Sequence, residues 1–147
     1  MPLLVDGNNV LHGLPTGYRS RETVRRLVLD LARRERLTVE LVFDGPPPPG
    51  RPEREPLGRV TVRYSGGASA DDVIVRRLPP GRAARQWTVV TDDGGLAARA
   101  RAAGASVRPS RWLAARLELR AATGPDDGPL TPEEVAAWER WFRERGR

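Results

Sequence analysis

The sequence predicts an α/β fold, a three-layer sandwich built on a central, mostly parallel sheet. Short apolar runs rich in β-branched residues alternate with longer segments of helical periodicity, and this alternation is typical of βαβ units. Such crossovers are right-handed and leave helices on both faces of the sheet. A length of 147 residues is enough for a single domain that buries its own core.

The expected elements follow in order along the chain. The expected strands are residues 3–5, 39–43, 59–64, 87–91 and 106–108. Helices are expected over residues 20–36, over a segment carrying Val73, Ile74 and Leu78, over residues 96–103, and from Trp112 onwards. In the first of these helices, apolar side chains recur at the i, i+3, i+4, i+7 spacing that places them on one face.

Two segments are expected to lack regular structure. Residues 45–58, GPPPPGRPEREPLG, are rich in proline, which removes backbone donors and fixes φ. A loop of this length in a compact domain is usually functional or mobile. Residues 79–86, PPGRAARQ, are interpreted as a second loop.

The domain is expected to span residues 1–123, followed by a linker and a last helix over residues 124–147. The linker contains GPDDG, and Thr131-Pro132-Glu133-Glu134 has the proline and the capping box of a helix start. The apolar face that follows predicts that this helix packs on the same domain, since a lone helix of about fourteen residues has no core of its own.

The composition favours a polyanionic partner. The chain carries 25 basic residues, all of them arginine, against 19 acidic ones, and guanidinium groups suit the geometry of phosphates. The alternative is solvated surface charge, because the arginines are spread along the whole chain. Cysteine is absent, which excludes disulfides and thiolate chemistry. With no basic leader and no apolar run of about 18 residues, a soluble cytoplasmic protein is expected.

Aspartates stand at or just beyond the ends of several apolar runs. They are Asp6, Asp44, the pair Asp71 and Asp72, and the pair Asp92 and Asp93. In parallel α/β sheets the carboxyl ends of the strands meet at one edge, so these side chains are expected to converge there. Each one alone is explained equally well by a turn or a helix cap.

Converging carboxylates repel one another unless a hard cation binds between them. Oxygen ligands favour Mg²⁺ or Mn²⁺ over zinc or copper, so a metal site made of all six aspartates is predicted. Such a site can activate water and screen a phosphodiester. His12, the only histidine, is a weaker candidate for a general base.

At these residues the chain resembles the NYN family of PIN-like nucleases, and its YacP-like branch in particular. The segments that carry the resemblance are LLVDGNNV, LVFDG, SADD and VVTDDGGLAARARAAGA, in the order of the family. The resemblance implies a PIN-like α/β sandwich that cleaves RNA with Mg²⁺ or Mn²⁺. It assigns Asp6, Asp44, Asp71 and Asp93 to the acidic, catalytic positions, with Asp72 as a fifth carboxylate.

The match has one departure, because the usual T-S-D of the fourth strand is Thr91-Asp92-Asp93 here. By register Asp93 is the matching acid, and Asp92 is either an extra ligand or points away. Asn9 matches the asparagine of the D-G-x-N opening, and Asn8 falls at the variable position. An amide can fix a carboxylate rotamer without adding charge.

Other polar residues are expected to support this site. Ser69 and Thr91 are candidates for hydrogen bonds behind the metal ligands, with N-capping and strand packing as alternatives. The expected RNA contacts are Arg19, Arg21, Arg25, Arg51, Arg54, Arg59 and Arg63, which lie in or beside the first long helix and the proline-rich loop.

These observations predict a metal-dependent endoribonuclease with RNA as its partner, and the ribosome or translation-associated RNA as a further partner. One alternative is a non-catalytic RNA-binding module with a vestigial acidic site. A phosphatase of the haloacid dehalogenase type is less consistent, because that class needs D-x-D and a lysine, and the chain has D-G-N and no lysine.

Overall fold

A computed structural model describes residues 2–122 together with residues 140 and 143. The linker and the last helix that the sequence predicts for residues 124–147 fall almost wholly outside the described residues. Among the described helices, none has both the length and the apolar character needed to cross a membrane.

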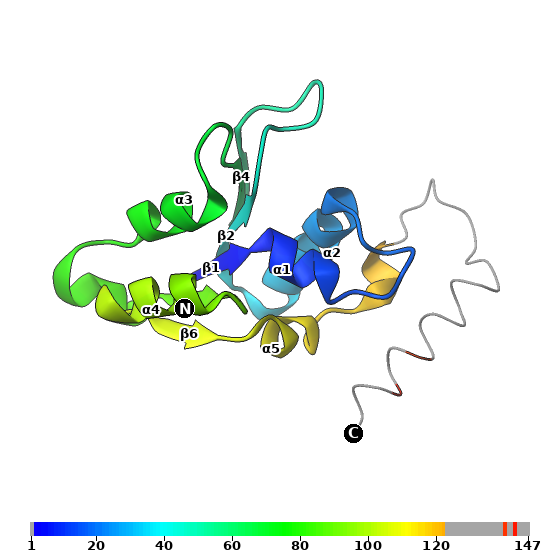
Figure 1. Ribbon diagram of the computed structural model, residues 1–147. Coiled ribbons are helices and arrows are strands. Elements are labelled where there is room, and N and C mark those ends of the chain that lie inside the picture. The colour runs from blue at the N-terminus through cyan, green and yellow to red at the C-terminus, as the bar shows by residue number, and fades with distance from the viewer. Residues whose placement is uncertain (1, 123–139, 141–142, 144–147) are drawn as a thin grey trace.

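The described residues form one six-stranded sheet with helices on both faces (Figure 1). Its strands are β1 (Pro2–Asp6), β2 (Thr38–Phe43), β3 (Arg54–Leu57), β4 (Val60–Tyr64), β5 (Thr88–Val90) and β6 (Ser106–Arg108). The helices are α1 (Gly7–His12), α2 (Arg21–Glu35), α3 (Ala70–Arg77), α4 (Gly94–Ala102) and α5 (Ser110–Ala114), with 3₁₀ segments η1 (Gly81–Gln86) and η2 (Leu119–Ala122).

The strand order is β3-β4-β2-β1-β5-β6. All neighbouring pairs are parallel except β3 and β4, which run antiparallel. This mostly parallel sheet with helices on both faces confirms the fold class predicted from the sequence.

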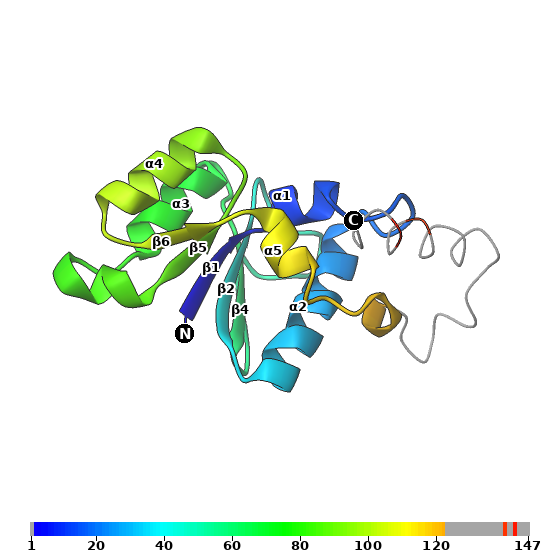
Figure 2. The ribbon, with the colours of Figure 1, turned by 90° about the horizontal axis from the view of Figure 1, so that it is seen from below.

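The central strand β1 divides the core into two layers. Leu3 and Val5 face the cluster packed by α1, α2 and α5, whereas Leu4 faces the cluster packed by α3 and α4. Figure 2 shows the two helical layers on opposite sides of the sheet. Side chains alternate along a strand, so a strand covered on both faces is apolar at nearly every position.

The expectation that residues 45–58 lack regular structure is wrong for β3. This strand lies at the edge of the sheet and pairs with β4, with Pro56 opposite Thr61. An edge strand has N–H groups that no neighbour needs, so it tolerates a proline. Residues 79–86 were likewise expected to form a loop, and most of them form η1.

Two further helices differ from the expectation. The short helix α1 follows β1 directly, and its six residues are too few to show a helical period. The helix expected from Trp112 begins at Ser110 and ends at Ala114.

Candidate metal centre at the carboxyl edge of the sheet

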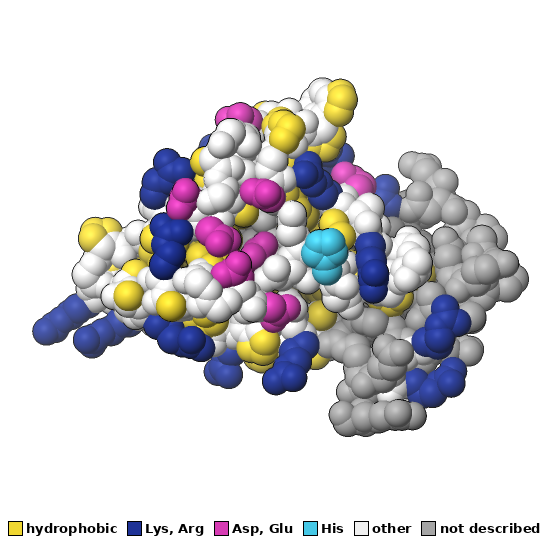
Figure 3. Space-filling view, in the orientation of Figure 1, with side chains coloured by type: hydrophobic (Ala, Val, Ile, Leu, Met, Phe, Trp, Pro, Cys, Tyr) yellow, Lys and Arg dark blue, Asp and Glu magenta, His cyan; other side chains and the backbone are white. Residues whose placement is uncertain are grey.

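The aspartates predicted to converge lie at the carboxyl edge of the central strands. Asp6 ends β1 and Asp44 directly follows β2, while Asp71 lies in the first turn of α3 and Asp93 is the N-cap of α4. Because β2, β1 and β5 are parallel neighbours, their carboxyl ends open on the same side. Figure 3 shows acidic side chains gathered at the centre of one face, with arginines around them.

Asp6 is the most enclosed of these acids. Its exposed fraction is 5%, and burial raises the pKa of its carboxyl above the ordinary value. The negative charge of Asp71 raises it further, whereas the Thr91 hydroxyl and the backbone amides of Asn9 and Asn8 act in the opposite direction. A buried carboxyl of this kind holds its charge at a cost, which a nearby cation would relieve.

Asp71 links the acids from separate elements into one electrostatic group. Burial raises the pKa of Asp71 most, and the negative charge of Asp93 raises it further. The Arg99 guanidinium lowers this pKa. The carboxylates of Asp72 and Asp44 add to the repulsion. Carboxylates from other segments therefore act on Asp71, and the Asp71 carboxylate acts in turn on Asp6.

The side chains along this rim offer carboxylate oxygens to a metal ion. Within the described part of the chain, no three His, Cys, Asp or Glu side chains are arranged to hold a metal ion. The donor set nevertheless fits a hard cation, because the rim offers only oxygen ligands and mutually repelling charges.

A hydrogen-bond hub connects the ends of β1 and β5. The buried Thr91 hydroxyl lies 2.9 Å from Asn9 Oδ1 and 3.3 Å from Asp6 Oδ2, and it accepts the backbone N–H of Asp93 at 3.0 Å. Asn9 Oδ1 also accepts the backbone N–H of Asp92 at 2.6 Å. These contacts fix the chain where Asp6 and Asp93 leave their strands.

A second set of contacts fixes the end of β2. Asn8 Oδ1 accepts the backbone N–H of Asp44 at 3.3 Å. The Asp44 carboxylate accepts hydrogen bonds from the Ser65 hydroxyl at 3.3 Å and from the backbone N–H of Ala70 at 3.1 Å, both through Oδ1. Asp44 is exposed, and its Oδ2 accepts no hydrogen bond from another described residue.

The remaining predicted carboxylates have protein partners. Asp92 Oδ1 accepts the backbone N–H of Ser110 at 2.8 Å, and Oδ2 accepts the Ser110 hydroxyl in a very short contact. Asp72 is exposed and forms an ion pair with Arg99 at 2.9 Å, and this partner lowers its pKa. Ser69 caps α3 by accepting the backbone N–H of Asp72.

Gly7 allows α1 to begin directly after Asp6. A Cβ at this position would lie 2.5 Å from Phe43 Cε1 and 3.0 Å from the carbonyl oxygen of Val42. Any larger residue here would have to displace the Phe43 ring, so packing favours glycine at this position. His12, at the other end of α1, is exposed.

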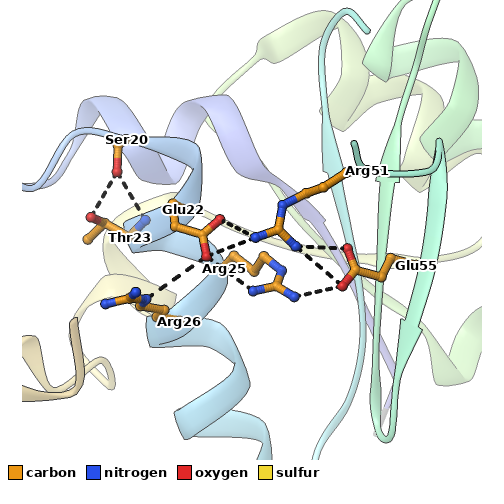
Figure 4. Close-up of polar contacts among 7 residues, drawn as sticks. All are labelled: Ser20, Glu22, Thr23, Arg25, Arg26, Arg51 and Glu55. Carbon is orange, nitrogen blue, oxygen red and sulfur yellow. Dashed lines mark hydrogen bonds and ion pairs between the residues drawn. The ribbon is translucent and has the colours of Figure 1, made fainter. Parts of the chain in front are cut away.

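Two of the predicted RNA-binding arginines are paired with glutamates. Arg25 contacts Glu55 at 2.7 Å and Glu22 at 3.2 Å, and Arg51 contacts the same two carboxylates at 3.2 Å and 3.1 Å (Figure 4). The network connects the proline-rich loop to α2 and β3. The positive charge of both arginines is therefore largely neutralised within the protein.

The other predicted arginines differ in how they are held. Arg21 donates to the carbonyls of Asp44 and Pro46 at 2.6 Å and 2.9 Å, and its guanidinium lies over the Tyr64 ring at 5.7 Å. These contacts hold the start of the loop beside Asp44. Arg19 and Arg59 donate to backbone carbonyls.

Sequence reasoning did not find Ser65, Ser110 or Gly7 as parts of the site. Ser65 lies directly after β4 and Ser110 at the start of α5, so each meets its aspartate only through the tertiary fold. For Gly7, the only indication in the sequence is the Asp-Gly pair at the end of the first apolar run, which is typical of a turn.

The mostly parallel sheet with helices on both faces defines an α/β domain of the PIN-like class. The chain belongs to the YacP-like NYN domain family, whose model matches residues 3–143. This match confirms the resemblance seen in the aspartate motifs, and the family consists generally of nucleases.

Two solved structures share the fold. A crystal structure of a mutant of Rae1 (YacP) from Bacillus subtilis has a TM-score of 0.57 and 21% sequence identity, over 99% of this chain and 95% of that one. Another crystal structure of Rae1 (YacP) from Bacillus subtilis has a TM-score of 0.55 and 20% sequence identity, over 98% of this chain and 80% of that one. No curated protein sequence matches the chain.

Proposed function

We propose that this protein is a metal-dependent endoribonuclease that hydrolyses RNA phosphodiester bonds at the acidic rim. The observation that carries the proposal is the position of aspartates from four segments at the carboxyl edge of the sheet. Membership in a family of nucleases supports the reaction class. The family also supports RNA as the substrate.

The direct metal ligands in this proposal are Asp6, Asp44, Asp71 and Asp93. Asp44 has one carboxylate oxygen without a hydrogen bond from the described residues, and the raised pKa values of Asp6 and Asp71 favour a cation nearby. When bound, Mg²⁺ or Mn²⁺ supplies Lewis-acid activation of water and neutralises charge on the phosphate.

Asp92 and Asp72 take outer roles in the proposal. Both oxygens of Asp92 are engaged by Ser110, and Asp72 is paired with Arg99. Asn9 and Thr91 orient the chain at Asp6 and Asp93, and Asn8 does the same at Asp44. Such supporting hydrogen bonds set the rotamers of metal ligands.

The test is cleavage of labelled single-stranded and structured RNAs with Mn²⁺, Mg²⁺ or EDTA. Asp71→Asn is the site variant, and Asp30→Asn is the matched control, since Asp30 lies on α2 and pairs with Arg34. We expect metal-dependent cleavage that Asp71→Asn abolishes and Asp30→Asn retains. Equal cleavage by the parent and Asp71→Asn would show that the site is assigned wrongly.

A non-catalytic RNA-binding module is the second candidate. It is favoured by the lack of three suitably arranged metal ligands in the described part of the chain. Tight RNA binding by the parent without cleavage in any metal would support this candidate. It would contradict the nuclease proposal. DNA strands of the same sequence, run in parallel, measure the preference for RNA.

A further inference from the structure

A strip of arginines lies on the outer part of the sheet, on the side of α3. The residues on either side of Glu40 and of Arg63 point into the α2 layer. Because side chains alternate along a strand, Glu40 and Arg63 lie on the opposite face, which α3 and α4 cover. Arg54 lies directly opposite Arg63 in the antiparallel pair. Arg77, the last residue of α3, reaches the same place through its contacts with Glu40.

Positive charge exceeds negative charge in this strip. Arg77 holds the buried Glu40 in a two-pronged contact at 2.7 Å and 2.9 Å. Arg63 Nη2 is 3.8 Å from the same carboxylate, and its Nε is buried without a hydrogen-bond partner among the described residues. Glu40 thus neutralises Arg77 and leaves Arg63 poorly compensated.

Arg54 adds a further positive charge to the strip. It is exposed, and its side chain has no hydrogen bond or ion pair with another residue in the described part of the chain. Like charges directly opposite each other on neighbouring strands are destabilising. Burial and the nearby Arg77 and Arg54 guanidinium groups lower the pKa of Arg63, which agrees with an unbalanced positive field.

Arg54 and Arg77 are exposed and Arg63 is half-buried, and the three residues lie beside the acidic rim. Helix α3 packs against β1 and β2, so it leaves this face of β3 and β4 less covered. Arg63 pairs with Val42, two residues before Asp44, which is about 7 Å along a strand. Arg77 follows Asp71 by six residues, or about 9 Å along a helix axis.

We propose that Arg54, Arg63 and Arg77 form a subsite for the backbone phosphates of a single-stranded RNA chain that leads to the acidic rim. The identity of the polyanion as RNA rests on the proposed function. The distances place the subsite about two to three nucleotides from the carboxylates, at about 3.4 Å per nucleotide of a stacked strand. Guanidinium groups bind phosphate without reading the base, so the subsite positions RNA of any sequence.

The subsite differs from the other arginines first expected to contact RNA. Arg25 and Arg51 are paired with two glutamates, and Arg21 is held by backbone carbonyls and an aromatic ring. Within the described residues, Arg63 and Arg77 share the single carboxylate of Glu40, and Arg54 has no carboxylate partner. Phosphate binding at Arg54 therefore requires no ion pair among these residues to break.

The test is the affinity of a short fluorescent single-stranded RNA, measured by anisotropy in EDTA so that no cleavage occurs. Arg54→Gln and the double variant with Arg63→Gln remove charge and leave the contact between Arg77 and Glu40 intact. The control is Arg85→Gln, which removes an exposed charge from η1, at the start of β5 and away from the rim. Circular dichroism verifies that each variant is folded.

Removing one arginine–phosphate contact should reduce the slope of log K against log salt by about 0.7, equivalent to about fivefold weaker binding at about 0.1 M salt. We expect this reduction for Arg54→Gln, a larger one for the double variant, and little change for Arg85→Gln. The effect should be similar for RNAs of different sequence and for DNA. Parental affinity in a folded double variant, or equal weakening in Arg85→Gln, would overturn the subsite.

The same preparations separate this inference from the proposed function. If the parent cleaves RNA with Mn²⁺ and the double variant binds RNA like the parent, only the subsite is wrong. If the parent never cleaves but the double variant binds more weakly and with a shallower salt dependence, the nuclease proposal fails and the subsite stands.

Discussion

Replacing Thr91 by valine tests whether the hydroxyl at the end of β5 supports the acidic rim. Valine has nearly the same shape as threonine, and Thr91 is 3% exposed, so packing is retained. The substitution removes the acceptor of the Asp93 N–H at 3.0 Å and a donor 2.9 Å from Asn9 Oδ1. It thus leaves a backbone donor without its partner.

The structure sets the size of this effect. An unsatisfied, partly buried donor costs about 1–3 kcal/mol. Asn9 Oδ1 keeps the Asp92 N–H at 2.6 Å, so the cost at this amide is small. We expect stability to fall by about 2 kcal/mol, which lowers Tm by about 4–8 °C for a domain of this size. Cleavage should fall as well, because Asp6 and Asp93 lose a common support.

Thr91→Ser is the matched control, because it keeps the hydroxyl and removes only a buried methyl group, worth about 0.8 kcal/mol. Urea denaturation gives the stability of both variants, and the metal-dependent RNA assay gives their activity. The valine variant should be the less stable and the less active of the two. If the serine variant is the less stable and the less active of the two, the contribution of Thr91 comes from packing rather than from hydrogen bonding, and the reasoning is refuted.

Three further outcomes are expected. Burial and neighbouring carboxylates raise the folded-state pKa of Asp71. The Asp71 charge therefore destabilises the metal-free fold at pH values above that pKa, and it has no effect at pH values below the ordinary pKa of about 3.9. Urea denaturation without metal should therefore show Asp71→Asn more stable than the parent at neutral pH, with the gain fading on acidification; a gain independent of pH contradicts the electrostatic origin. Asp92→Ala removes the acceptor for Ser110 at the start of α5 and should cost about 1 kcal/mol of stability while keeping cleavage; loss of cleavage in a folded variant would make Asp92 a metal ligand. Gly7→Ala sets a Cβ 2.5 Å from the Phe43 ring and should cost about 1–3 kcal/mol in thermal or urea unfolding, whereas parental stability would show that the ring yields freely.

Most of the sheet could be predicted from the sequence because hydrophobic periodicity is a local signal. The buried strand over residues 38–43 and the helix over residues 21–35 lie within one residue of their expected bounds. The acidic rim followed from a single rule, that carboxyl ends of parallel strands share an edge.

What could not be predicted depends on contacts between distant segments. The strand β3 contains a proline, and only its position at the edge of the sheet makes that residue acceptable. The pairing of each arginine depends on which carboxylate lies within reach: Arg25 meets Glu55 thirty residues later, whereas Arg54 meets none among the described residues. Sequence shows the sign of a charge but not its partner.

The antiparallel strand β3 has a consequence for the behaviour of the protein in a crowded solution. Without it, β4 would present a row of unpaired backbone groups flanked by valine and tyrosine, which is a template for pairing with another chain. β3 pairs with that row, and its exposed residues are Arg54 and Pro56. Proline cannot donate a hydrogen bond to a further strand. A variant that lacks β3 would thus be expected to self-associate through β4, even if its acidic rim were intact.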